Sequence, residues 1–245
     1  MSIHIGVGGW TYEPWRGPFY PAGLAQKREL EYAGQQLTGI EINGTYYGSQ
    51  KPETFANWAA AVPDGFQFSV KASRFTTNRK ILAEGAGSIE KFLTQGITRL
   101  GDRLGPIHWQ FMATKKFDRD DFAGFLDLLP DSQDGVPLRH AIEVRDESFR
   151  DPAFIAMLRE RNMAVVYADS DEFPCIHEQT ADFTYARLQR SQEDVETGYD
   201  AKALDAWAKQ ARDWSAGNRD VFFFFISGAK VRNPAAAQAL IAKLR

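Results

Sequence analysis

Two glutamates interrupt short apolar runs of the sequence. Glu41 lies in GIEIN and Glu143 in HAIEV, each within two residues of the end of its run. A carboxylate in a buried strand needs a cationic partner or water, because desolvating it unpaired is costly. Two interpretations stay open. Either the glutamates pair with buried Arg or Lys side chains, or at least one is catalytic, as a general acid or base whose pKa its neighbours adjust.

Cationic side chains stand at the ends of other apolar runs. Lys71 follows FQFSV, Arg145 follows AIEV, Arg187 lies in FTYARL, and Lys230 is a further candidate after VFFFFI. Guanidinium and ammonium groups are the side chains that bind phosphates and carboxylates. The alternative is that nearby acidic residues neutralise them. We expect the first three to bind a ligand, and this much positive charge disfavours glycoside hydrolysis of a neutral sugar by the glutamate pair.

The sequence contains no recognisable spacing of metal ligands and no motif for a covalent nucleophile. Its four histidines show no HxH or HExxH spacing, and the single cysteine, Cys175, indicates an ordinary thiol. No GxSxG motif is present. We therefore expect no cofactor and metal-independent chemistry, with a Mg²⁺ ion held by Glu143 and Asp169 as an open alternative. If the chain is an enzyme, carboxylate acid/base chemistry suits a hydrolase or an isomerase.

Eight β-rich runs alternate with stretches of helical spacing. The runs are residues 3–7, 39–43, 66–70, 106–111, 140–144, 164–168, 183–188 and 221–226, and the helical stretches are 24–37, 53–61, 88–104, 119–129, 152–161, 200–214 and 234–244. Residues 170–182 offer at most a short turn of helix. No linker-like stretch divides the chain, so we expect residues 1–245 to form a single α/β domain, a (β/α)8 TIM barrel. A doubly wound sheet is the rival, but its GxGxxG fingerprint is absent.

Ligands of such barrels bind at the C-terminal ends of the strands and on the loops that follow. Besides the charged residues above, we expect ligand contacts from Trp10, Tyr12, Asn43, Tyr47, Gln110 and Asp169. In a strand, Glu41 shares one face with Asn43, and Glu143 with Arg145.

The loop after the first run, GGWTYEPWRGPFYP, is rich in aromatic residues and has little propensity for helix or strand. We expect Trp15, Phe19 and Tyr20 to pack it onto the top of the barrel. Arg16 either pairs with a carboxylate or joins the cations at the ligand site.

The overall composition disfavours several classes of partner. The formal charge of -3 gives no overall attraction to nucleic acid or anionic membranes, although a local basic cleft stays compatible with it. The N-terminus lacks the basic segment and the long apolar segment of a signal peptide, and VFFFFI is too short to span a bilayer. We expect a cytoplasmic protein without a membrane partner. The oligomeric state is left open.

Several longer motifs carry a resemblance to a known family. GVGGWTYEPWRGPFYPAGL, GIEINGTYYGSQKPETFANW, FQFSVKASR, LGPIHWQF, HAIEVRDESF and YARL occur in this order. Together they resemble the YecE-like family, domain of unknown function 72, from about residue 5 to 240. The resemblance implies a TIM barrel and no particular activity. It places the family's recurrent polar residues on Trp10, Tyr12, Arg16, Tyr20, Glu41, Asn43, Thr45, Tyr47, Trp58, Lys71, Gln110, Glu143, Arg145 and Arg187 of this chain.

The chain departs from the family pattern at three places. Asn78 stands where a histidine is typical, Gln189 begins a pair that is usually His-Gly, and Ser227 belongs to a pair that is usually Asn-Asn. These departures imply an altered specificity or a lost activity, if the replaced residues do chemistry in relatives.

The expected function is the binding of a small anionic ligand, bearing phosphate or carboxylate, at the C-terminal mouth of the barrel. Acid/base catalysis by Glu143 or Glu41 would accompany it. Two alternatives stay open. One is a nucleic-acid-binding or nuclease-like barrel, which is less favoured because barrel nucleases generally need metals. The other is a non-catalytic scaffold that binds a partner.

Overall fold

Eight parallel strands close into a barrel in the computed structural model, which describes residues 2–245. In the order of the chain they are β1 (Ile3–Gly8), β2 (Gly39–Ile42), β3 (Gln67–Lys71), β4 (Leu104–Gln110), β7 (His140–Glu143), β8 (Ala164–Asp169), β9 (Phe183–Leu188) and β10 (Asp220–Phe225). Strand β1 pairs with both β2 and β10, which closes the ring. The predicted (β/α)8 barrel is confirmed.

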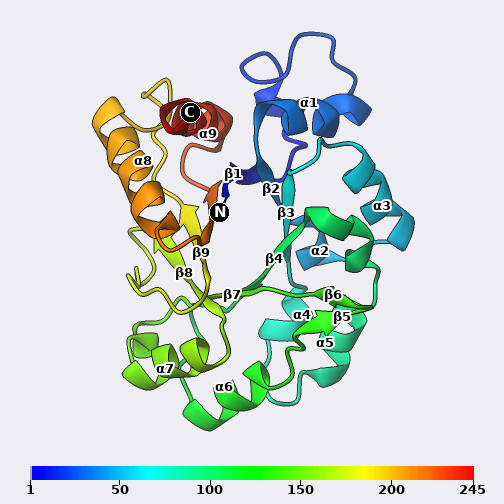
Figure 1. The fold of residues 1–245 in the computed structure, drawn as a ribbon, viewed down its shortest axis with the longest axis vertical. Coiled ribbons are helices and arrows are strands. Elements are labelled where there is room, and N and C mark those ends of the chain that lie inside the picture. Colours follow the sequence, from blue (N-terminus) through cyan, green and yellow to red (C-terminus); the bar gives the residue numbers. More distant parts are fainter. Residues whose placement is uncertain (1) are drawn as a thin grey trace.

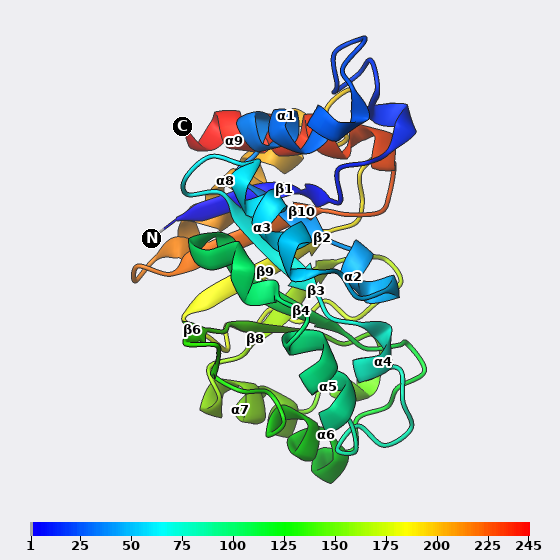
Figure 2. The same cartoon turned by 90° about the vertical axis from the view of Figure 1, so that its right-hand side faces the viewer.

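Helices surround the strands on the outside of the ring (Figure 1). They are α1 (Glu29–Gln36), α2 (Gly44–Tyr47), α3 (Pro52–Ala60), α4 (Arg74–Thr77), α5 (Ala86–Leu93), α6 (Arg119–Leu126), α7 (Pro152–Glu160), α8 (Ala201–Ser215) and α9 (Asn233–Leu244). Helices α1 and α9 lie side by side (Figures 1 and 2), where Gln238 Nε2 donates to Gln36 Oε1 at 3.2 Å. Within residues 2–245, no helix has the length and apolar character needed to cross a bilayer.

The remaining elements are short. The 3-10 helices are Glu13–Trp15, Gln26–Arg28, Ile97–Arg103, Glu147–Phe149 and Lys230–Arg232, and a small hairpin joins β5 (Ser132–Gln133) to β6 (Val136–Pro137). The hairpin and the four-residue helices α2 and α4 were not expected. The predicted helix over 88–104 divides, because Gly96 adopts φ +109 after α5 and a 3-10 helix follows. Residues 170–182 contain no helix or strand.

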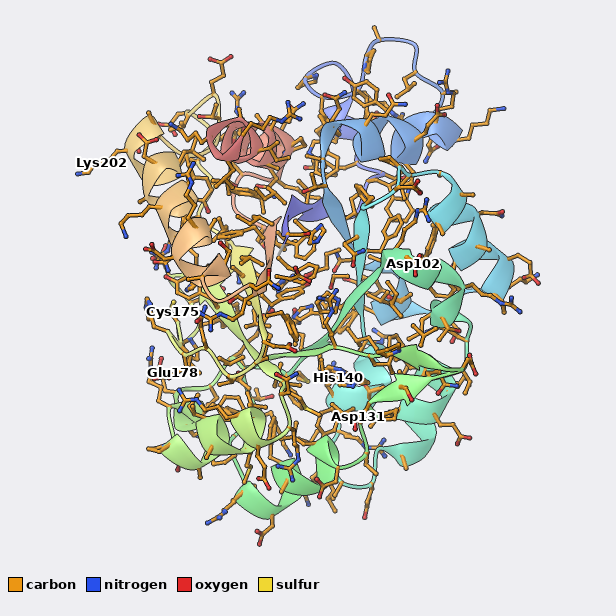
Figure 3. All side chains as sticks on the ribbon, viewed as in Figure 1. Asp102, Asp131, His140, Cys175, Glu178 and Lys202 are labelled. Carbon is orange, nitrogen blue, oxygen red and sulfur yellow. The ribbon has the colours of Figure 1, made fainter. Side chains whose placement is uncertain are left out.

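The phenylalanine run of β10 is explained by burial on both faces of the strand. Phe222 and Phe224 pack with Tyr185 inside the ring, whereas Phe223 packs outward against Trp214 of α8. Side chains alternate along a strand, so a parallel barrel strand needs apolar residues at successive positions. The all-side-chain view shows the ring of strands filled with side chains (Figure 3). The barrel is therefore a packed core, and a ligand must bind at its end.

Strands β1 and β2 approach closely because glycine faces glycine in their register. Gly6 pairs with Gly39, and a Cβ atom on Gly6 would lie 1.7 Å from the Gly39 carbonyl oxygen. This pairing places Glu41, two residues further along β2, beside Gly8 at the mouth.

We expect Gly6→Ala to lower the free energy of unfolding by about 3 kcal/mol or more, because the backbone of β2 must move to admit the methyl group. Urea unfolding followed by circular dichroism measures this. The matched control is Gly87→Ala in α5, where a Cβ meets nothing within 4 Å and helix propensity rises. A Gly6→Ala protein as stable as the wild type would contradict the close approach.

Candidate functional site

A buried charge cluster, formed by Glu41, Glu143 and Arg187, joins three strands across the barrel. Arg187 on β9 donates from Nε and Nη2 to the two carboxylate oxygens of Glu41 on β2, each at 3.1 Å. Its Nη1 donates to Glu143 Oε2 on β7 at 2.6 Å. All three side chains are buried. Of the two interpretations of the glutamates, pairing with a buried cation is the one the contacts show.

Further donors complete the coordination of both carboxylates. Tyr185 OH donates to Glu41 Oε2 at 2.7 Å, and Arg145 Nε donates to Glu143 Oε1 at 2.7 Å. Burial is the largest single effect and would raise the pKa of each glutamate, but the charge of Arg187 together with the other neighbouring cations and hydrogen-bond donors outweighs burial. The pKa of Glu41 falls to about 2, and that of Glu143 lies well below its usual range. Both are ionised at neutral pH, so neither can act there as a general acid.

His108 on β4 lies between the two carboxylates. Its Nε2 is 2.8 Å from Glu143 Oε2, and its Nδ1 is 3.5 Å from Glu41 Oε2 without a hydrogen bond. Burial is the main cause that lowers the pKa of His108, which keeps the ring neutral, so Nε2 donates to Glu143. The sequence indicated a core position for this histidine and not its contact with the cluster. The sequence signal for this contact is that His108 lies two residues before Gln110 on the same strand, so that their side chains share one face.

A cavity of about 750 Å³ opens above the buried charge cluster at the C-terminal ends of the strands. It is lined by seven of the residues expected at the site: Trp10, Asn43, Tyr47, Lys71, Gln110, Arg145 and Arg187. Lys230, Tyr46, Trp58 and Ser227 also line it. Among the lining residues of the described chain there is no Asp or Glu.

Three cations converge on one neutral oxygen at the base of this cavity. Gln110 Oε1 accepts from Lys71 Nζ at 2.8 Å, from Arg145 Nη2 at 2.8 Å and from Arg187 Nη1 at 3.3 Å. Burial first, and then the charge of Arg187, lower the pKa of Lys71 to about 8, against the opposing pull of Glu41 and Glu143. Three positively charged groups therefore meet at an uncharged acceptor, the side-chain amide oxygen of Gln110.

Two aromatic rings support the cations of the mouth. The guanidinium carbon of Arg145 lies 4.1 Å from the ring centroid of Phe173, which comes from the irregular segment 170–182. Lys230 Nζ lies 4.2 Å from the ring centroid of Tyr12. Such contacts hold a cation without neutralising it. Phe173 was missed at the sequence level because an irregular loop has no periodicity that predicts where its side chains point.

Several expected site residues lie away from the cavity wall. Glu41 and Glu143 are beneath it, and Tyr12 contacts Lys230 from outside the lining. Arg16 pairs with Glu29, with 3.0 Å between Nε and Oε1, which is the first of the two alternatives for this arginine. Asp169 lies 3.3 Å from Arg190 Nη1 and accepts from Tyr199 OH. Burial raises the pKa of Asp169.

The aromatic loop after β1 packs as expected. Trp15, Phe19 and Tyr20 are buried against one another, and Trp15 Nε1 donates to the Lys230 carbonyl oxygen at 2.9 Å. Tyr20 OH donates to the Trp10 carbonyl oxygen at 2.5 Å. The packed part of the loop thus holds the backbone on either side of the cavity. Within residues 2–245, no group of three or more His, Cys, Asp and Glu side chains is arranged to hold a metal ion.

Comparison with known proteins identifies the family. The family model described as "Protein of unknown function DUF72" matches residues 4–245. The chain belongs to the DUF72 family. It is similar to UPF0759 protein YecE of Escherichia coli strain K12, with 28% identity over 142 residues that cover 56% of this chain and 48% of that protein. The chain spans about half the length of the curated relatives it matches.

Solved structures of DUF72 proteins share the barrel. A DUF72 family protein from Thermotoga maritima superposes with a TM-score of 0.76 at 23% identity, covering 99% of this chain and 98% of that one. One from Enterococcus faecalis gives 0.74 at 18% identity, covering 99% and 95%. At these identities the likeness shows the fold.

Of the three residues that the sequence analysis compared with the family pattern, Asn78 and Ser227 lie at the cavity or beside it. Asn78 Nδ2 donates to Tyr46 OH at 3.3 Å, and Tyr46 lines the cavity. Ser227 lines it too, with φ +63, a left-handed conformation that favours asparagine over serine. The Nε2 atom of Gln189 is buried without a hydrogen-bond partner. Asn78 and Ser227 are therefore placed where they contribute to the cavity wall or to its support.

We expect Glu41→Gln to lower the free energy of unfolding by about 3–5 kcal/mol, because it removes one of the two carboxylates that compensate the buried Arg187. Urea unfolding measures the loss. The control is Glu147→Gln, which removes an exposed partner of Arg150 and should change the free energy by less than about 1 kcal/mol. Equal losses in the two variants would contradict the role of the buried charge cluster.

The lowered pKa of Glu41 predicts that the protein loses stability in acid. The pKa of this carboxyl is about 2 in the folded state against an ordinary 4.5, so its contribution to stability is complete above pH 4.5. That contribution disappears as the pH falls from 4.5 toward 2, at about 1.4 kcal/mol per pH unit. Unfolding curves across this range should show a smaller loss in Glu41→Gln than in the wild type. Parallel losses would argue against the lowered pKa.

Proposed function

We propose that this DUF72 protein binds a small anionic ligand, bearing a phosphate or carboxylate group, at the C-terminal mouth of the barrel. The observation that carries the proposal is the convergence of Lys71, Arg145 and Arg187 on the single neutral oxygen of Gln110. An anionic oxygen satisfies such donors better than an amide oxygen, because charge-assisted hydrogen bonds are roughly twice as strong as neutral ones.

The charges around the mouth do not balance. The two glutamates of the buried charge cluster compensate Arg187 and Arg145. Neither Lys71 nor Lys230 has a carboxylate within 4.0 Å in the part of the chain that the structure describes. Desolvation lowers the pKa of Lys230, as burial does for Lys71. A bound anion would supply the missing negative charge.

The size and walls of the cavity favour a small molecule. Its volume of about 750 Å³ falls in the range of about 300–1,000 Å³ that is usual for such ligands. Trp10 and Trp58, with ring centroids 5.1 Å apart, and the exposed Tyr47 offer apolar surface to the uncharged part of a ligand.

The two glutamates take a positioning role in this proposal. Glu41 holds Arg187 with both carboxylate oxygens and Glu143 holds it with one, and neither glutamate lines the cavity. Proton transfer by Glu143 or Glu41 stays a prediction. A carboxylate with a strongly lowered pKa is a weak base, so catalysis through either would require a change in its contacts when the ligand binds.

The test is thermal unfolding with inorganic phosphate and a series of small phosphorylated and carboxylated compounds. A ligand at a hundred times its dissociation constant adds about 2.7 kcal/mol, which raises the Tm of a protein of this size by roughly 5–10 °C. Arg145→Met should weaken binding about 10- to 100-fold, because it removes a charge-assisted hydrogen bond.

The control for this test is Lys202→Met, which removes a charge from the outer surface. Lys202 lies on α8 and points away from the barrel (Figure 3). Its removal should leave binding unchanged. Equal Tm shifts in Arg145→Met and the wild type, or a series in which no anion raises the Tm, would overturn the proposal.

A further inference from the structure

Lys71 is the enclosed amine of the cavity. Its side chain is 8% exposed at the end of β3, whereas Lys230 lies exposed at the rim. Thr45 of α2 donates a hydrogen bond of 2.7 Å to the Lys71 carbonyl oxygen and so fixes the strand end that carries the amine. Strand ends at this face are where barrel enzymes carry their reactive groups.

The surroundings of Lys71 Nζ disfavour its protonated form. Its hydrogen-bond acceptor is the neutral amide of Gln110, and it has no carboxylate within salt-bridge distance among the described residues. The Tyr46 ring, with its centroid 4.5 Å from Nζ, acts in the opposite direction and favours the cation. Burial and then the charge of Arg187 lower the pKa of Lys71 from 10.5 to about 8. At pH 7.5 about a quarter of such amines are neutral, against about one in a thousand for an ordinary lysine.

We propose that Lys71 Nζ forms an imine with a carbonyl compound that carries a phosphate or carboxylate group. The geometry places a reactive amine and an anion-binding group at one end of the same cavity. Lys71 Nζ and Arg145 Nη2 are each 2.8 Å from Gln110 Oε1, so the two nitrogens lie at most twice this distance apart. This inference rests on the proposed function, because the guanidinium groups hold the anionic end while the amine meets the carbonyl carbon.

The step balances without an oxidant or a reductant. The lone pair of the neutral amine attacks the carbonyl carbon, a C–N bond forms, and the C=O electron pair moves to oxygen, which takes a proton. The nitrogen loses its protons as the oxygen leaves as water, which gives the C=N bond. Neutral lysines activated by desolvation and a cationic neighbour react with carbonyl compounds in this way. The resulting activity would belong to enzymes that transform anionic aldehydes, ketones or 2-oxo acids through a covalent intermediate.

The test is reductive trapping on the whole protein. Dihydroxyacetone phosphate is added at pH 7.5 with sodium cyanoborohydride, which delivers hydride to the imine carbon and leaves a stable secondary amine. Peptide mass spectrometry then locates the modified lysines. We expect Lys71 to be modified at least tenfold faster than the exposed Lys202 in the same sample. We also expect at least tenfold slower modification of Lys71 with uncharged dihydroxyacetone, and slowing by inorganic phosphate.

Variants and thermal shifts separate the two proposals. Lys71→Met should abolish the fast adduct, and Lys209→Met, which removes an exposed lysine of α8 outside the cavity, should retain it. If phosphate raises the Tm but Lys71 reacts no faster than Lys202, the imine is overturned and the anion site stands. If phosphate leaves the Tm unchanged and the two lysines react alike, both proposals fail. If Lys71 reacts equally fast with both carbonyl compounds, the requirement for an anionic group is overturned.

Discussion

The guanidinium of Arg187 cannot be buried in this barrel unless two carboxylates from other strands meet it. Its hydrogen bonds reach Glu41 on β2 and Glu143 on β7, so one side chain from β9 connects opposite parts of the ring. An unpaired buried charge costs several kcal/mol, which makes the three residues a single unit. That unit forms the base of the cavity, and Arg145 and Gln110 of the mouth are hydrogen-bonded to it directly.

The composition of the barrel interior changes along the strands toward the mouth. Phe222 and Phe224 pack the interior with Tyr185, and Arg187 follows Tyr185 by two residues on the same face of β9. On β4 the same spacing takes the chain from the buried His108 to Gln110 at the cavity. The apolar part excludes water from below, which strengthens the ion pairs above it. The packed aromatic core thus contributes to the electrostatics of the site as well as to stability.

Sequence patterns predicted the strands and the cavity-lining residues at the strand ends, because both follow from the alternation of apolar runs with helical stretches. A carboxylate in an apolar strand indicated either a buried cationic partner or a catalytic group, and the position of Arg187 at a strand end made it a candidate for ligand binding. Position in the chain could not show where the side chain of a loop residue, or of the last residue of a strand, points. Arg16 follows the first strand but turns to Glu29, and Asp169 ends β8 but meets Arg190. Phe173 contributes to the site from a segment without periodicity, so only the folded chain brings it to Arg145.

The charge cluster also supports the proposal of a lysine, and not a carboxylate, as the reactive group of this site. Two glutamates bound by arginines, tyrosine and histidine are held in their ionised form and have little basicity left. The guanidinium that lowers the pKa of these carboxylates also lowers that of Lys71, because a positive charge stabilises an anion and destabilises a neighbouring cation. Burial and this buried arginine together lower the pKa of the amine, whereas the arginine favours the ionised form of both acids. In the imine proposed above, the lysine takes the reactive role that the sequence suggested for the carboxylates.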